Sequence, residues 1–353
     1  MPEQQAGFEI GVYTLGDITP HPVTGRLIPA QQRLQEIIEA SKLADEAGLD
    51  IFGIGEHHRL DYAVSATAVF LASVAQATKR IKLTSATTVL STVDPVRLFE
   101  EYATLDLLSN GRVEIIAGRG AFLESFDLYG YSISDYDELF NENIELFQLL
   151  NQNERISWQG QFRPPLHEAE IAPRPIQKQI PIWTGVGGRL ESAERAGRLG
   201  TGMVLAILGG DPASFKPLVD TYRATGISLG HSASNLKVGI TGHGYIATTK
   251  EQAKEEYYTY YSNYRKYVSG QLGHGDVHIS RAEFEQMAGP DTALFVGSPQ
   301  QIIEKILRQY ELFGHQRCML QLDIGGLPFD KVAKSIELLA TEVAPVIRRE
   351  ICK

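Results

Sequence analysis

Three side chains suited to proton transfer follow a short apolar segment in the first sixth of the chain. Residues 51–55 are apolar or glycine, and Glu56, His57 and His58 come directly after them. Histidine titrates near neutrality, so it can accept or release a proton in a reaction at pH 7. In an extended chain neighbouring side chains point to opposite sides, so one histidine can enter a site while the other supports it. The alternative is a buried structural network of polar residues.

A second group of residues has the features of a phosphate site. The glycine-rich turn 185–188 connects an apolar segment to a helical pattern. Glycine allows the backbone to approach a ligand closely, and the following helix presents unpaired N–H groups and the positive end of its dipole. Arg119 ends another apolar segment, and its guanidinium could bind two phosphate oxygens. The alternatives are a tight turn with no ligand and an ion pair of Arg119 with Glu124 or another acidic residue.

Strand and helix patterns alternate along the whole chain and must position these residues. The expected strands are near-continuous apolar runs, which are typical of a parallel sheet buried on both faces. Eight strands, each followed by a helix, predict a closed (β/α)8 barrel with insertions after the fourth and seventh strands. The strands are expected at 8–14, 51–55, 81–88, 112–118, 180–185, 203–208, 236–242 (extending as far as 247) and 318–324, and the helices at 29–47, 65–78, 95–108, 135–150, 189–199, 212–225, 250–268, 299–313 and 329–349.

Two segments interrupt this alternation. Residues 151–179 are polar and contain a predicted hairpin at 158–162, and residues 269–291 are rich in Gly, His and Asp and are expected to be irregular. In a barrel of this kind the active site lies at the carboxyl ends of the strands. Polar residues and glycines are concentrated at those ends, so we expect the candidate residues to meet there.

Metal and dinucleotide sites are weaker explanations of the same sequence. Adjacent histidines on opposite faces make a poor pair of ligands, and the pair His274 and His278 lies in a glycine-rich segment where no helix would hold it. The G-x-G-x-x-A match at 242–247 continues a strand and opens no helix, so it is weak evidence for nucleotide binding. Six tyrosines within 257–267 have helical spacing, which usually indicates a core or an interface.

The composition limits the class of protein. The chain has 353 residues, with 33 Lys and Arg against 43 Asp and Glu, for a net charge of −10. The acidic balance argues against nucleic-acid binding, and no apolar run reaches the roughly 18–20 residues of a membrane span. The two cysteines exclude a disulfide scaffold, and the first residues lack a secretion signal. We therefore expect a soluble cytoplasmic enzyme with no nucleic-acid or membrane partner.

The strand ends together resemble those of the bacterial luciferase-like flavin-dependent monooxygenases, over essentially the whole chain. The resemblance rests on Glu56–His57–His58, the Ala86 region, and the segments 110–120, 173–185 and 296–299. It implies one barrel domain, 1–353, that binds FMN in its reduced form. It also implies a mobile lid at 269–291.

The resemblance also implies roles for particular residues. His57 would be the catalytic base, and Glu56 and His58 would position it. The FMN phosphate would bind Arg119 and the N–H groups of the glycine turn, and the flavin ring would lie near the third and fourth strand ends. Luciferase has a cysteine immediately before this arginine, where this chain has Gly118, so light emission is not implied. The implied cofactor-binding residues are Ala86, Thr87, Gly118, Arg119, Gly120, Gly185, Val186, Gly187 and Gly188.

The implied reaction inserts one oxygen atom from O₂ into a small, largely apolar organic substrate. A separate NAD(P)H flavin reductase would supply reduced FMN, and the enzyme would be a homodimer. Three alternatives remain open at this point: a deazaflavin-dependent hydride-transfer enzyme on the same barrel, a non-catalytic flavin-binding protein, and a metal-dependent barrel hydrolase.

Overall fold

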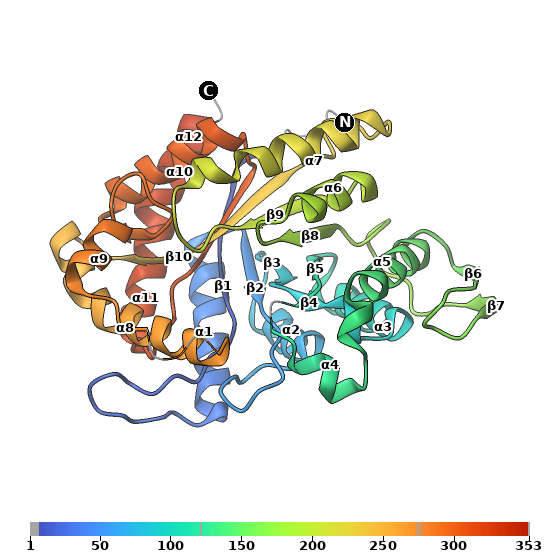
Figure 1. The fold of residues 1–353 in the computed structure, drawn as a ribbon, viewed down its shortest axis with the longest axis horizontal. Helices are drawn as coiled ribbons and strands as arrows, with labels where there is room; N and C mark the ends of the chain where they lie inside the picture. Colours follow the sequence, from blue (N-terminus) through green and yellow to red (C-terminus); the bar gives the residue numbers. More distant parts are fainter. Residues whose placement is uncertain (1–6, 121, 274, 276, 352–353) are drawn as a thin grey trace.

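The computed structural model describes residues 7–120, 122–273, 275 and 277–351. Eight parallel strands form a closed ring, because β1 pairs with β2 on one side and with β12 on the other (Figure 1). The (β/α)8 barrel predicted from the sequence is therefore confirmed. The barrel strands are β1 (Glu9–Thr14), β2 (Ile51–Ile54), β3 (Lys82–Ser85), β5 (Val113–Gly118), β8 (Ile182–Val186), β9 (Gly202–Ala206), β10 (Val238–Ile246) and β12 (Arg317–Gln321).

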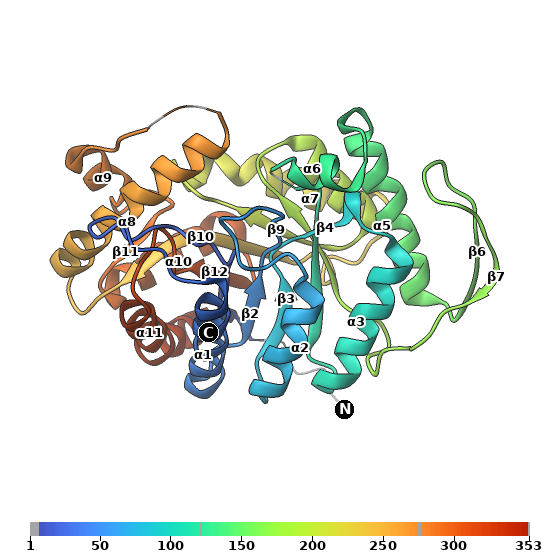
Figure 2. The ribbon, with the colours of Figure 1, turned by 90° about the horizontal axis from the view of Figure 1, so that it is seen from below.

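Helices surround the barrel, as Figure 2 shows for α1, α2 and α3. Local sequence signals set several of their ends. Asp94 accepts hydrogen bonds from the first amides of α3, and Pro95 occupies the first helical position. Gly48 ends α1 in the left-handed conformation. The outer helices are α1 (Ala30–Ala47), α2 (Thr67–Ala77), α3 (Pro95–Ser109), α5 (Tyr136–Gln152), α6 (Leu190–Leu199), α7 (Lys216–Ser228), α8 (Lys250–Gln271), α10 (Pro299–Phe313), α11 (Phe329–Leu338) and α12 (Ala344–Ile351).

Side chains fill the barrel interior in layers, so the space for a ligand lies at one end. At the amino ends of the strands, Arg317 is 1% exposed and its guanidinium lies 2.6 Å from Glu9 and 2.7 Å from Glu114. Burial raises the pKa of Glu9, but Arg317 and Lys82 lower it by more, so the carboxylate stays ionised. Above these charges lies an apolar plug made of Tyr13, Ile51, Ile116, Trp183, Val204 and Met319.

The two insertions lie where the sequence predicts them. After β5 come α4 (Glu124–Tyr129), α5 and an antiparallel hairpin of β6 (Arg155–Trp158) and β7 (Leu166–Glu170), which projects away from the barrel (Figures 1 and 2). The predicted hairpin at 158–162 is real, but its strands flank that segment. After β10 come α8, α9 (Arg281–Met287), β11 (Phe295–Gly297) and α10.

The structure corrects several predicted boundaries. The strand expected at 81–88 divides at the cis peptide bond between Ala86 and Thr87, and β4 (Thr88–Val89) then pairs with β5. The segment 269–291 is not irregular throughout, because a capping box of Ser280 and Glu283 starts α9. The helix expected at 329–349 contains a π-helical turn, Leu339–Val343. Short 3-10 turns lie at Leu90–Thr92, Ile133–Asp135 and Pro212–Phe215.

The described residues include no helix that is both long and apolar enough to cross a membrane. Two residues of the glycine- and histidine-rich segment, His274 and Asp276, lie outside the described residues.

Candidate active site

A cavity of about 980 Å³ opens at the carboxyl ends of the barrel strands, above the apolar plug. All of the site residues predicted from the sequence lie on its wall. The reason is topological, because the ends of parallel barrel strands surround one opening. The predicted residues lining the cavity are Glu56, His57, His58, Ala86, Thr87, Gly118, Arg119, Gly120, Gly185, Val186, Gly187 and Gly188.

Arg119 is held in place by α5 and α6. Its guanidinium forms an ion pair with Asp137 and donates a hydrogen bond to the Ser192 hydroxyl over 2.8 Å. It also lies 4.8 Å from the centre of the Tyr136 ring. The ion pair with an acidic residue, considered above as an alternative role for Arg119, is therefore present, but its partner is Asp137 of α5 and not Glu124. Asp137 and Ser192 were not identified from the sequence, since they lie 18 and 73 residues beyond Arg119 and no local pattern connects them.

Positive charge exceeds negative charge around Arg119. Arg195 donates to the same Asp137 carboxylate over 2.8 Å, so one carboxylate serves two guanidinium groups. Burial raises the pKa of Asp137, but Arg119 and Arg195 lower it by more, and the carboxylate is ionised at neutral pH. Arg189, at the start of α6, also lines the cavity. Three arginines and one aspartate suit the binding of an anion.

The glycine turn before α6 leaves room for such an anion. A Cβ atom added at Gly187 or Gly188 would meet no heavy atom within 4 Å. No described side chain caps the first amides of α6, which begins at Leu190. Uncapped N–H groups at a helix start bind phosphate well, and here they lie beside the arginine cluster. Together, these residues fit the phosphate group of a flavin nucleotide.

The glycines deeper in the cavity have a packing role. A Cβ atom at Gly118 would lie 2.7 Å from Thr87 Oγ1, and one at Gly185 would lie 3.1 Å from Thr87 Cγ2. Both glycines therefore allow Thr87 to sit between β5 and β8. Together with Ala86 they leave little side-chain bulk on this part of the cavity wall, which suits a flat ring.

Of the adjacent histidines His57 and His58, only His57 has a ring nitrogen without a hydrogen-bond partner among the described residues. Its Nδ1 lies 3.1 Å from Glu124 Oε1, and its ring stacks on Tyr62 with 4.0 Å between ring centres. Burial raises the pKa of Glu124, but hydrogen bonds from His57 and from backbone amides lower it by more. An ionised Glu124 accepts the Nδ1 proton, so a neutral His57 has its lone pair on Nε2. Within the described part of the chain, no hydrogen bond to Nε2 is recorded.

Glu56 and His58 pair with each other and not with His57. His58 Nε2 lies 2.8 Å from Glu56 Oε1, and its Nδ1 lies 3.3 Å from the Tyr129 hydroxyl. The other Glu56 oxygen accepts a hydrogen bond from the Val89 amide. This pair therefore connects β2 to β4 and α4. Glu124, 67 residues beyond His57, is the carboxylate that orients it, and no local sequence pattern connects the two residues.

The opposite half of the cavity contains polar residues that sequence reasoning did not select. His243 lies within the G-x-G-x-x-A match, and Tyr264 belongs to the tyrosine-rich segment of α8. Of that segment, Tyr257 and Tyr261 are buried core residues. Burial, with a smaller effect of Arg265, lowers the pKa of His243 to about 3, so its ring is neutral near pH 7. The polar residues of this half are Tyr13, Thr241, His243, Tyr264 and Gln321.

Within the described ranges, no group of three or more His, Cys, Asp or Glu residues is arranged to hold a metal ion.

Comparisons with known proteins agree with this geometry. Residues 8–316 match the family model for luciferase-like monooxygenases. The chain is 24% identical over 338 residues to the oxygenase component of the flavin-dependent trigonelline monooxygenase of Acinetobacter baylyi, covering 89% of this chain and 90% of that protein. It is also 31% identical over 179 residues to the F420-dependent glucose-6-phosphate dehydrogenase of Amycolatopsis mediterranei, covering 48% and 53%.

Two solved structures share the fold. The monooxygenase RslO1 from Streptomyces bottropensis superposes with a TM-score of 0.83 at 23% identity, covering 96% of this chain and 99% of that one. The oxygenating constituent of 3,6-diketocamphane monooxygenase from Pseudomonas putida, in complex with FMN, superposes with a TM-score of 0.78 at 20% identity, covering 97% and 99%. The chain belongs to the luciferase-like monooxygenase family and is an oxidoreductase.

Proposed function

We propose that this protein is an FMN-dependent monooxygenase that uses reduced FMN and O₂ to insert one oxygen atom into a small, largely apolar organic substrate. One observation carries the proposal: Arg119 and Arg189 line the same cavity as His57, whose Nε2 has no hydrogen-bond partner among the described residues. A cofactor anchored by phosphate at one wall and a proton acceptor at another are what this reaction needs.

The phosphate-binding role is assigned to Arg119 and to the amides around Gly187 and Gly188. Arg119 is already fixed by Asp137 and Ser192, so it loses little conformational freedom when an anion binds. The flavin ring is assigned to the part of the cavity wall formed by Ala86, Thr87, Gly118, Gly120, Gly185 and Val186. The FMN complex of a structural relative supports this choice of cofactor.

The residues around His57 control a proton. Reduced FMN, when bound, supplies the electrons and activates O₂. His57 accepts a proton at Nε2, and the Glu124 carboxylate stabilises the resulting imidazolium through Nδ1. Tyr62 and Phe122 pack against the ring and hold its orientation. Glu56 and His58 act indirectly, by holding the strand end that carries His57.

The source of electrons is proposed to be a separate NAD(P)H flavin reductase. The relative in Acinetobacter baylyi is named as an oxygenase component, which supports a two-component system. The homodimer and the lid at 269–291 remain predictions that gel filtration and hydrogen exchange would test.

Binding of three cofactors tests the proposal. Oxidised FMN, anaerobically reduced FMN and the deazaflavin F420 are titrated into the purified protein, and saturable binding of reduced FMN is expected. A His57→Asn variant should bind FMN normally and lose about 100-fold or more of its oxygenation rate with a flavin reductase present. No saturable binding of either form of FMN would overturn the proposal.

A deazaflavin-dependent hydride-transfer enzyme is the second candidate. It is favoured by the 31% identity to an F420-dependent dehydrogenase over about half of this chain. Tight binding of F420 with weak binding of FMN would establish it in place of the monooxygenase.

A further inference from the structure

Two buried polar side chains on the cavity wall have no partner for part of their hydrogen-bonding capacity. Gln321 is 1% exposed, and neither its amide oxygen nor its amide nitrogen bonds to any described residue. His243 is 3% exposed, and its Nε2 lies 3.3 Å from the Tyr264 hydroxyl. Its Nδ1 is without a partner in the same described ranges. Buried polar groups are nearly always paired, so these atoms call for an explanation.

The barrel register places these two side chains next to each other. His243 of β10 and Gln321 of β12 are direct partners in the parallel ladder. Met319, two residues before Gln321, belongs to the apolar plug inside the barrel. Since side chains two residues apart on a strand point the same way, Gln321 faces the interior one layer closer to the opening.

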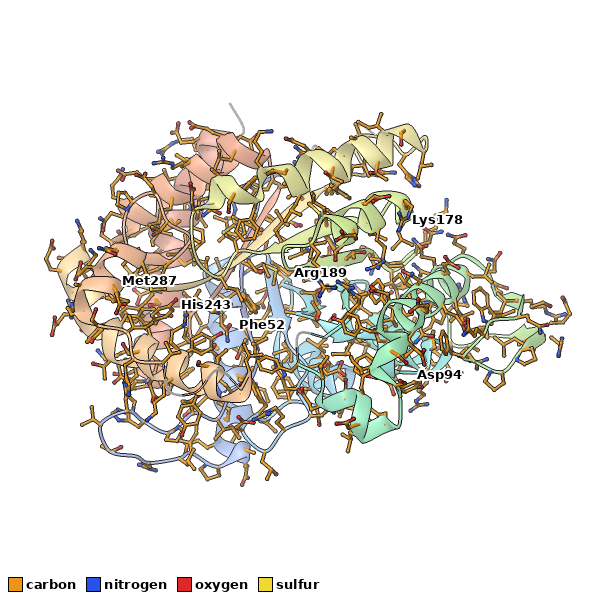
Figure 3. All side chains as sticks on the ribbon, in the orientation of Figure 1. Phe52, Asp94, Lys178, Arg189, His243 and Met287 are labelled. Carbon is orange, nitrogen blue, oxygen red and sulfur yellow. The ribbon has the colours of Figure 1, made fainter. Side chains whose placement is uncertain are left out.

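His243 and Gln321 lie on a different side of the barrel from the residues assigned to the FMN phosphate. The strand order β1, β2, β3, β5, β8, β9, β10, β12 places β5 and β8 opposite β12 and β1. Figure 3 shows His243 on the β10 side and Arg189 at the start of α6. The amide of Gln321 is therefore far around the ring from the residues assigned to the FMN phosphate.

On this side, no described residue that lines the cavity carries a charge to balance a charged ligand; Arg265 of α8 acts on His243 but does not line the cavity. The described lining residues with ionised side chains are Glu56, Arg119, Glu124 and Arg189, and they come from the ends of β2 and β5, the start of α4 and the start of α6. His243 is neutral near pH 7 because burial lowers its pKa to about 3. A charged group brought here would lose its hydration without gaining a counter-ion.

We propose that Gln321 and His243 form a recognition site for a neutral substrate group that contains both a hydrogen-bond donor and an acceptor, as a carboxamide or a lactam does. The Gln321 amide donates through Nε2 and accepts through Oε1, so it can make two parallel hydrogen bonds with such a group. His243 Nδ1 adds a third contact. This inference rests on the proposed function and narrows its substrate to an apolar body that bears one neutral amide-like group.

Four probes of nearly equal shape test the proposal: benzamide, acetophenone, benzoate and cumene. Calorimetry measures their affinity for the wild-type protein and for Gln321→Met, each with and without saturating FMN. Benzamide is expected to bind the wild type about ten-fold more tightly than acetophenone or benzoate, which corresponds to the loss of one to two neutral hydrogen bonds. In Gln321→Met that preference should vanish while the affinity for cumene is retained or increased.

Gln309→Met is the matched control. Gln309 is 2% exposed and its amide is also unpartnered within the described residues, but it lies on α10 and does not line this cavity. The control should keep the preference for benzamide. His243→Phe retains an aromatic ring beside Tyr264 and should weaken the binding of benzamide several-fold. It gives an independent measurement if Gln321→Met does not fold.

The outcomes separate this inference from the proposed function. A wild-type protein with no preference for benzamide, or a Gln321→Met protein that keeps it, overturns the recognition site. A Gln321→Met protein that loses affinity for FMN but not for benzamide also overturns it, because the amide would then contact the flavin. Failure of FMN to bind while the benzamide preference persists overturns only the proposed function.

Discussion

The two halves of the barrel opening differ in the side chains that line them. The half formed by the ends of β2, β3, β5 and β8 is rich in glycine, and its Glu56, Arg119 and Glu124 each pair with a neighbouring side chain. The half formed by β10, β12, β1 and α8 presents large polar side chains, two of which have atoms without a hydrogen-bond partner in the part of the chain that the structure describes. The first half suits a flat cofactor that approaches the backbone, and the second suits a ligand selected by its hydrogen bonds.

Arg119→Ala should have the largest effect on the first half. Loss of charge-assisted hydrogen bonds to the phosphate is expected to weaken FMN binding by about 10- to 100-fold. The fold should survive, because Asp137 keeps its hydrogen bond from Arg195. Fluorescence titration measures the change. Arg198→Ala, which removes an exposed arginine of α6, is the control and should leave FMN affinity unaltered.

Gly187→Val tests whether the backbone of the turn forms part of the cofactor site. The added side chain meets no protein atom near its Cβ position, so the thermal midpoint should be nearly unchanged. It occupies cavity space, however, and should weaken FMN binding about ten-fold, because the added side chain would crowd the ligand. Gly209→Val is matched, since its Cβ position is also open but it does not line the cavity. Equal FMN affinities in the two variants would show that the turn is not part of the cofactor site.

Glu124→Gln separates catalysis from binding within the first half. The oxygenation rate should fall about ten-fold or more because His57 loses the carboxylate that stabilises its imidazolium, while FMN affinity stays within about two-fold. The pKa of Glu124 is lowered from 4.5, so its ionised form contributes fully above that pH and is lost as the pH falls through the lowered value. The ratio of wild-type to variant rates should thus be constant from about pH 6 to 8. A ratio near one across that range would contradict the assignment.

Tyr264→Phe should have the smallest effect on the cofactor. It removes the hydroxyl that lies 3.3 Å from His243 Nε2, on the half assigned to substrate. FMN affinity should remain within about two-fold, and stability should fall by about 1 kcal/mol through loss of one buried hydrogen bond. Titration and thermal unfolding measure the two quantities. A large loss of FMN affinity would show that the cofactor contacts both halves. It would contradict the assignment of one half to the cofactor and the other to the substrate.

The sequence alone determined the barrel and the location of the site. Apolar strand patterns and helix caps are local properties, so most elements could be predicted within a few residues of their ends. Residues at the carboxyl ends of parallel strands must gather at one opening, which is why Glu56, Arg119 and Gly187 could be predicted to share a cavity.

The tertiary structure alone decided which side chains pair. Glu124 reaches His57 from 67 residues away, Ser192 reaches Arg119 from 73 residues away, and Gln321 meets His243 only through the β10–β12 register. Such contacts depend on strand order and on how helices dock against the barrel. Neither can be predicted from the local periodicity of the sequence. The split of one predicted strand at Ala86 and the start of α9 inside a segment expected to be irregular likewise emerged only from the folded chain.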